Sequence, residues 1–134
     1  MFGVSKTDPR LRNKAEVLAL RLSPPGGGGA AQPAAIAAEF LHKERVYHLD
    51  FAGQHLVIVT STGGANRVYQ AGSHRFRRGP GDGRLLDAKE RVWVAEENQL
   101  RATFDSTLGL PRVPAHRAFW FGWYAQHPDT LLIR

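Results

Sequence analysis

The segment Phe119-Trp120-Phe121-Gly122-Trp123-Tyr124 is the part of the sequence that decides the fold, because it holds two of the three Trp residues of the chain. At about 100° per residue, a helix over residues 114–127 places Trp120, Trp123 and Tyr124 on one side. Each aromatic side chain buries on the order of 150–250 Å² when it packs. We therefore predict that this helix lies over a sheet, although an aromatic platform for a cation, a sugar or a membrane surface is the alternative. The predicted core residues are Trp93, Phe119, Trp120, Trp123 and Tyr124.

The sequence before this segment predicts one short helix among several loops. Residues 1–14 are polar and form an extended lead-in, and residues 23–33 hold three prolines and four consecutive glycines that predict a flexible loop. Pro33 can occupy the first turn of a helix. Residues 34–43 follow it with apolar side chains on one side, which is typical of a short amphipathic helix.

Short stretches of alternating or β-branched residues predict strands in the rest of the chain. Ala52 and Gly53 separate two of them and predict a hairpin turn. The expected strands cover residues 16–22, 45–51, 54–61, 67–71, 74–77, 84–87, 91–95 and 99–104. A chain of 134 residues is the usual size of a single domain. We therefore predict one α+β domain with a mainly antiparallel sheet of about six to eight short strands, either open or barrel-like, and two helices.

The composition excludes several classes of function. The chain has no cysteine, which excludes disulfides, thiolate metal sites and cysteine nucleophiles. No apolar run approaches the ~18 residues that a membrane span needs, so we expect a soluble chain without a transmembrane segment. The 18 Lys and Arg residues exceed the 12 Asp and Glu residues, and the formal charge of +6 attracts an acidic partner.

A cluster on the expected hairpin is the only candidate for a metal site. Pairing across the Ala52-Gly53 turn places Asp50 opposite His55, with His48 on the same face. Two imidazoles and a carboxylate can hold a divalent metal with open positions, as in a metal-dependent hydrolase. A polar, solvated hairpin face explains the same residues, and we expect no cofactor.

A basic stretch is the candidate for partner binding. Arg75, Arg77 and Arg78 alternate with Phe76, as in proteins that bind single-stranded nucleic acid. An edge strand whose charges prevent aggregation has the same pattern. The stretch has only one aromatic residue among three arginines, which is weak support for nucleic-acid binding. The sequence therefore favours an acidic protein partner or a larger assembly over nucleic acid.

Known catalytic motifs are absent from the sequence. The glycine-rich loop lacks the Lys and Ser or Thr of a phosphate-binding loop, and no G-x-S-x-G elbow surrounds Ser61. Acidic residues at positions 87, 90, 96 and 97 are expected to be solvated charges at strand ends. The sequence therefore favours a non-catalytic binding or assembly module over an enzyme.

Several stretches resemble the C-terminal half of a bacterial family known as domain of unknown function 3179. Residues 7–14 resemble its Asp-x-Arg-Leu-x-x-Lys lead-in, and Arg67-Val68-Tyr69 resembles its Arg-x-Tyr strand. Val92-Trp93-Val94 with Glu97 and Leu100 resembles its Trp-x-Val-x-Glu-x-x-Leu stretch, and residues 110–123 resemble its closing Leu-Pro-x-His-x-x-aromatic-Trp-Phe-x-Trp.

The resemblance implies a folded bacterial module, often exported, without an established reaction. The longer N-terminal half of family members carries a Cys-containing motif that this chain lacks, so no role of those cysteines transfers. The glycines at positions 26–29 are an insertion, and His48-Leu49-Asp50 stands where the family usually has Asn-Asp. The resemblance leaves two alternatives: the chain is part of a longer native protein, or it is an independent counterpart of the C-terminal half.

Overall fold

The computed structural model describes residues 10–27 and 29–134, so most of the expected lead-in lies outside the described residues. Contacts between Cα atoms divide the chain into two compact units. We call residues 41–114 the central unit, and residues up to 40 together with 115–134 the terminal unit. The single domain expected from the length stays a prediction.

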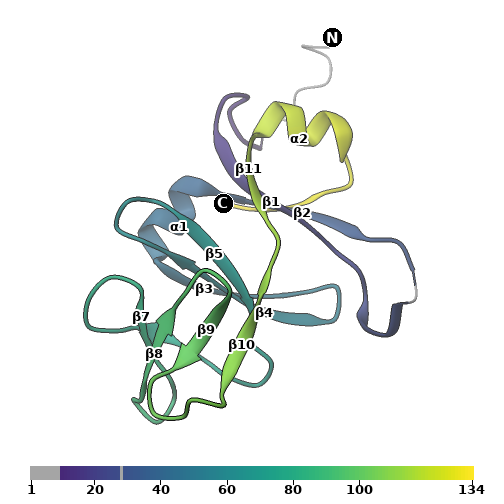
Figure 1. The fold of residues 1–134 in the computed structure, drawn as a ribbon. Coiled ribbons are helices and arrows are strands. Elements are labelled where there is room, and N and C mark those ends of the chain that lie inside the picture. Colours follow the sequence, from purple (N-terminus) through teal and green to yellow (C-terminus); the bar gives the residue numbers. More distant parts are fainter. Residues whose placement is uncertain (1–9, 28) are drawn as a thin grey trace. The chain divides into compact units, whose positions relative to one another are not determined.

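The central unit is an antiparallel sheet of eight strands that curls into a nearly closed barrel (Figure 1). The order of the strands is β3-β4-β5-β10-β9-β8-β7-β6. β10 pairs with β5 on one side and with β9 on the other, so it joins strands β3 to β5 and strands β6 to β9 into one sheet. The strands are β3 (Val46–Phe51), β4 (Gln54–Thr60), β5 (Asn66–Gln70), β6 (Arg77–Arg78), β7 (Arg84–Leu86), β8 (Val92–Ala95), β9 (Gln99–Ala102) and β10 (Gly109–Val113).

Side chains, rather than a backbone ladder, join the two edge strands of this sheet. His48 on the edge strand β3 accepts a hydrogen bond at Nε2 from the backbone N–H of Phe76, just before the other edge strand, β6 (2.9 Å). The two rings also stack, with centroids 6.2 Å apart. His48 is therefore a side-chain link between the two edges.

The core of the central unit surrounds Trp93, which is completely buried as predicted. Its indole Nε1–H donates to the carboxylate of Asp87 (3.0 Å). That carboxylate also accepts hydrogen bonds from the backbone N–H groups of Lys89 and Arg91 and from the Arg91 Nε–H. Burial opposes ionisation and is the largest single contribution, but these hydrogen bonds together outweigh it and lower the pKa of Asp87 to about 2. The expectation of a solvated charge at this position is wrong.

The terminal unit is a mixed four-stranded sheet with the order β11-β1-β2-β12. Its strands are β1 (Glu16–Leu22), β2 (Gln32–Ala37), β11 (His116–Phe119) and β12 (Leu131–Ile133), of which β12 runs parallel to β2. The helix α2 (Trp120–Gln126) packs on this sheet. Its buried residues Trp120 and Trp123 contact Val17, Ala19 and Ala35. The predicted helix over a sheet is confirmed.

The C-terminal helix is shorter than the sequence predicts, and one of its expected core residues is exposed. Residues 116–119 pair with β1 instead of continuing the helix, so Phe119 is the last residue of a strand. Its side chain points away from the core and is 54% exposed. The prediction that Phe119 is a core residue is therefore wrong, whereas Trp120 and Trp123 are buried and Tyr124 is partly buried.

The helix expected at residues 34–43 is also half strand. Residues 32–37 form β2, and only α1 (Ala38–Glu44) is helical. β2 pairs with β1 on one side and with β12 on the other, and most of its residues are buried. Ladder hydrogen bonds and burial from both partners outweigh the helix propensity of the alanines.

We predict that Asp87→Asn destabilises the protein, because the neutral amide replaces one acceptor oxygen with a donor facing buried N–H groups. The free energy of unfolding should fall by on the order of 3 kcal/mol, measured by denaturant unfolding. Wild-type stability from Asp87 is present above pH 4 and is lost as the pH falls toward its folded pKa of about 2, and the variant should lack this acid-dependent loss. Asp105→Asn at an exposed site is the control, and an equal effect of both variants would contradict the assignment.

We also predict that His48 makes stability depend on pH near neutrality. Burial and then the positive charge of Arg75 lower the pKa of His48 below its ordinary value, so the folded state favours the neutral ring that accepts the Phe76 N–H. Stability is complete above pH 6.5 and should fall as the pH drops below it, by less than about 1.4 kcal/mol per pH unit. In unfolding curves at pH 7.5 and 5.5, His48→Gln should reduce the difference between the two conditions. His42→Gln, at an exposed position of α1, should not.

Candidate anion-binding site

The site begins at Arg45, which ends helix α1 in an unusual backbone conformation. Its φ is 67°, and its N–H donates to the Leu41 carbonyl (2.9 Å), which closes the helix. Glycine usually occupies this left-handed position, because a Cβ there costs on the order of 1 kcal/mol. Contacts of the Arg45 side chain must therefore offset this conformational cost.

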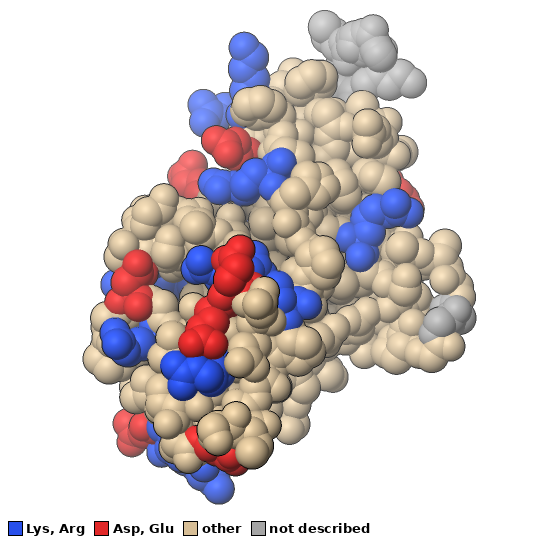
Figure 2. All heavy atoms as spheres, in the orientation of Figure 1, with Lys and Arg blue, Asp and Glu red and all other residues tan. Residues whose placement is uncertain are grey.

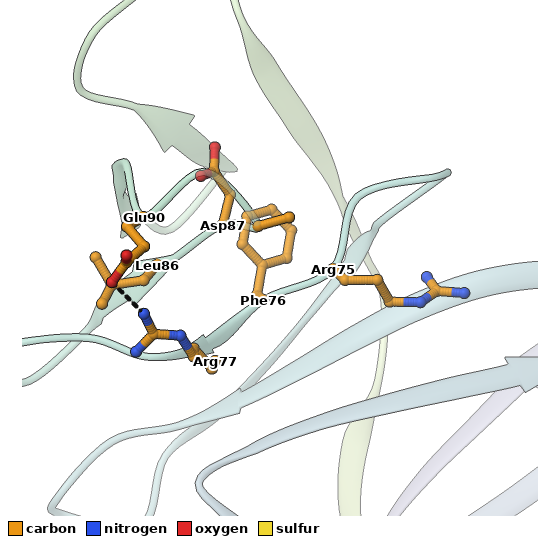
Figure 3. Close-up of a pocket in the computed structure, with 7 residues that line it drawn as sticks. Arg75, Phe76, Arg77, Leu86, Asp87 and Glu90 are labelled. Carbon is orange, nitrogen blue, oxygen red and sulfur yellow. Dashed lines mark hydrogen bonds and ion pairs between the residues drawn. The ribbon is translucent and has the colours of Figure 1, made fainter.

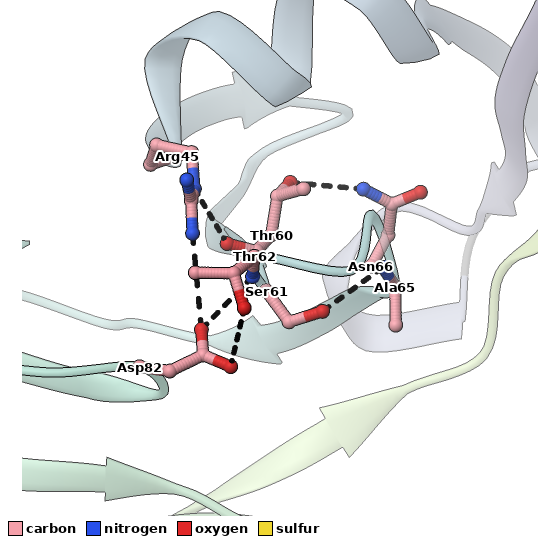
Figure 4. Close-up of polar contacts among 7 residues, drawn as sticks. All are labelled: Arg45, Thr60, Ser61, Thr62, Ala65, Asn66 and Asp82. Atoms are coloured by element: carbon pink, nitrogen blue, oxygen red, sulfur yellow. Dashed lines mark hydrogen bonds and ion pairs between the residues drawn. The ribbon is translucent and has the colours of Figure 1, made fainter.

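The Arg45 guanidinium lies against the end of β4 and the loop between β6 and β7 (Figure 4). Its Nε–H donates to the Thr60 carbonyl (3.1 Å), and its Nη2 lies 3.8 Å from Asp82 Oδ1. Only 16% of the Arg45 side chain is exposed. A largely buried cation of this kind needs a nearby negative charge.

Asp82 supplies that charge from the tight loop Gly79-Pro80-Gly81-Asp82-Gly83. A Cβ on Gly79 would lie 2.8 Å from the Arg84 carbonyl oxygen, so this close backbone approach requires glycine. The Thr62 N–H donates to Asp82 Oδ1 (3.0 Å) and the Thr62 hydroxyl donates to Oδ2 (3.1 Å). The backbone N–H of Thr62 makes the largest contribution to the lowered pKa of Asp82, and desolvation opposes it. The Thr62 hydroxyl, the Arg45 charge and the Gly83 N–H add to the lowering.

These residues line a cavity of about 200 Å³ in which positive charge is in excess. Its charged lining residues are Arg45, Arg78, Arg84 and Asp82. Within the described part of the chain, the guanidinium groups of Arg78 and Arg84 have no hydrogen-bond or ion-pair partner, and both residues are exposed. Guanidinium groups bind carboxylates and phosphates through paired N–H donors. The cavity is therefore suited to a small anionic group.

The structure separates the three arginines that the sequence predicts for partner binding. Arg78 lines the cavity described above, whereas Arg75 and Arg77 line a second hollow of about 430 Å³. There Arg77 Nη2 donates to Glu90 Oε1 (2.7 Å), and Arg75 extends away from both acidic side chains (Figure 3). Neighbouring residues of a strand point to opposite faces, which separates Arg77 from Arg78 in β6.

The three residues of the expected metal site do not come together. Asp50 and His55 face each other across the hairpin as predicted, with 2.7 Å between Asp50 Oδ1 and His55 Nδ1. His48 instead accepts the Phe76 N–H at Nε2. No group of three His, Cys, Asp or Glu side chains that could hold a metal occurs in the residues that the structure describes.

Several charged side chains outside the cavity are paired with one another. Figure 2 shows basic and acidic residues interspersed over the visible face. Arg67 and Arg112 both approach Glu97, and Arg101 pairs with Glu96. The net positive charge therefore does not form one continuous patch on this face, whereas Arg78 and Arg84 both line the same cavity.

The sequence did not reveal Arg45, Asp82 or Arg84 as site residues. The sequence predicts only an irregular, glycine-rich segment at residues 79–83, and it places Arg45 at the start of a strand. One signal was available, since an aspartate between two glycines is typical of a tight turn that presents a carboxylate. The partners of that carboxylate come from loops about 20 and 37 positions earlier, and no local pattern connects them.

No helix among the described residues is both long and apolar enough to cross a membrane.

Comparison with known proteins places the chain in a family. Neither the search of curated proteins nor the search of solved structures found a match. The family model described as "Protein of unknown function (DUF3179)" matches residues 1–130, which confirms the resemblance seen in the sequence. The chain belongs to the DUF3179 family of proteins of unknown function.

Proposed function

We propose that the chain is a non-catalytic binding module whose arginine-lined cavity takes an acidic group of a protein partner. The observation that carries the proposal is the excess of positive charge around the cavity of about 200 Å³. Arg78 and Arg84 approach this cavity from β6 and β7, and Arg45 approaches it from the end of α1.

The state of the two exposed arginines supports this assignment. An Arg that already has a carboxylate partner, such as Arg77 with Glu90, must give up that partner before it binds another anion. Within the described residues Arg78 and Arg84 have no such partner to lose. A carboxylate entering the cavity that they line with Arg45 gains charge-assisted hydrogen bonds from more than one guanidinium.

The size of the cavity favours a side-chain carboxylate over a large ligand. Ligand pockets for drug-sized molecules span about 300–1,000 Å³, and this cavity is smaller. A glutamate or aspartate of a partner fits such a site as one anchor of a wider protein interface. The overall positive charge would accelerate the encounter with an acidic partner.

We predict that Arg78→Glu and Arg84→Glu each weaken binding of a fluorescent hexaglutamate peptide by about tenfold or more, because each reversal places a repelling charge in the cavity. Fluorescence anisotropy at low ionic strength measures the dissociation constant. Wild-type affinity should fall as salt is added, since exposed charges are screened.

Arg21→Glu is the matched control, because Arg21 is exposed in the terminal unit and its reversal changes the net charge by the same amount. This variant should lose much less affinity than the two cavity variants. An equal loss in all three variants would show that the peptide responds only to net charge, and it would contradict the proposed site.

A further inference from the structure

We infer that Asp82 is a built-in competitor, an internal carboxylate that occupies the anion position of the cavity and is displaced when an acidic partner binds. This inference rests on the proposed function, since it concerns the regulation of the same site. Its basis is the arrangement of donors around Asp82 (Figure 4).

The two oxygens of Asp82 are held as a bound carboxylate would be. Oδ1 accepts the Thr62 N–H at 3.0 Å, and Oδ2 accepts the Thr62 hydroxyl at 3.1 Å. The Arg45 Nη2 lies 3.8 Å from Oδ1. A backbone donor, a hydroxyl donor and a guanidinium thus converge on one carboxylate, which is the donor set that an incoming glutamate or aspartate would use.

The exposure of the two charges shows which of them can be exchanged. The Arg45 side chain is 16% exposed, and its position at the end of α1 holds it in place. The Asp82 side chain is 48% exposed and projects from a surface loop. Arg45 is therefore the fixed component that needs an anion, and Asp82 is the component that can leave without opening the core.

The loop around Asp82 has few contacts that would prevent this exchange. Gly81 and Gly83 flank it, with φ values of 94° and 73°. No heavy atom lies within 4 Å of the position that a Cβ of Gly83 would take. The loop is anchored at both ends, because the Gly79 N–H donates to the Arg84 carbonyl and the Gly83 carbonyl accepts the Ala95 N–H. Only the tip between these anchors, which carries the Asp82 side chain, can shift while the base stays fixed.

Asp105 provides an internal comparison. It also accepts a backbone N–H and a hydroxyl from one threonine, Thr107, at 3.0 and 2.7 Å. Thr107 is only two positions away in the chain, and Asp105 does not line the arginine cavity. Asp105 thus reproduces the threonine donors of Asp82 without the cations.

Chemical rescue tests the inference. Asp82→Ala leaves Thr62 and Arg45 without their carboxylate, so the melting temperature should fall, and sodium acetate should raise it again by filling the vacated position. Sodium chloride at matched ionic strength should restore less. Wild type and Asp105→Ala should show no such specific response to acetate. The absence of an acetate-specific rise in Asp82→Ala would overturn the inference.

Asp82→Asn provides a second readout if the alanine variant does not fold. The amide retains one acceptor for Thr62 but removes the negative charge, so hexaglutamate should bind about three- to tenfold more tightly than to wild type. Asp105→Asn should leave the affinity near the wild-type value. An unchanged or weaker affinity of Asp82→Asn would show that Asp82 is only a structural contact between loops.

The two experiments separate this inference from the proposed function. If wild type binds hexaglutamate through Arg78 but Asp82→Asn does not bind more tightly, the binding site stands and the competitor role fails. If acetate rescues Asp82→Ala although wild type does not bind the peptide, Asp82 does occupy an anion position and the acidic protein partner is wrong.

Discussion

The central unit depends on how the two edges of its eight-stranded sheet are joined, because a sheet that curls without closing leaves unpaired strand edges. Polar side chains make this connection. His48 on β3 accepts the N–H of Phe76 next to β6, and Asp82 after β6 accepts from Thr62 after β4. His48 lies within β3, whereas its partner Phe76 and both Asp82 and Thr62 lie in loops. The contacts at this opening are therefore largely polar, and those of Asp82 involve an ionised carboxylate.

The candidate site and this closure share residues, which links stability to binding. Arg45 lies in a strained backbone position and contacts both Thr60 and Asp82, so it belongs to the fold and to the cavity. An anion that replaces Asp82 would take over one of the contacts between the loops. Binding would then change the closure of the sheet edges without disturbing the core around Trp93, which is held separately by the buried carboxylate of Asp87.

The sequence predicted the candidate site only in part, because its residues are brought together by long-range contacts. The Asp50–His55 pair was predictable, since a two-residue turn sets the register of the hairpin, and both turn residues have positive φ. The role of His48 was not predictable, because its partner Phe76 lies 28 positions away. Of the three arginines expected to act together, only Arg78 reaches the cavity. Arg45 and Arg84 join it through the folding of the sheet.

The sequence by itself determined the local elements whose pattern is strong: the strands at residues 16–22, 45–51 and 54–61 and an aromatic helix with Trp120 and Trp123 buried. It also determined that the main sheet is antiparallel, because short strands alternate with tight turns. Only the tertiary structure decided three other features. Residues 32–37 became a strand because two neighbours pair with them, Pro111 lies within β10 although proline cannot donate to a ladder, and Phe119 ended a strand instead of entering the core. The physical reason is the same in each case: ladder hydrogen bonds and burial between distant segments outweigh local propensity, and a single sequence does not record which segments will meet.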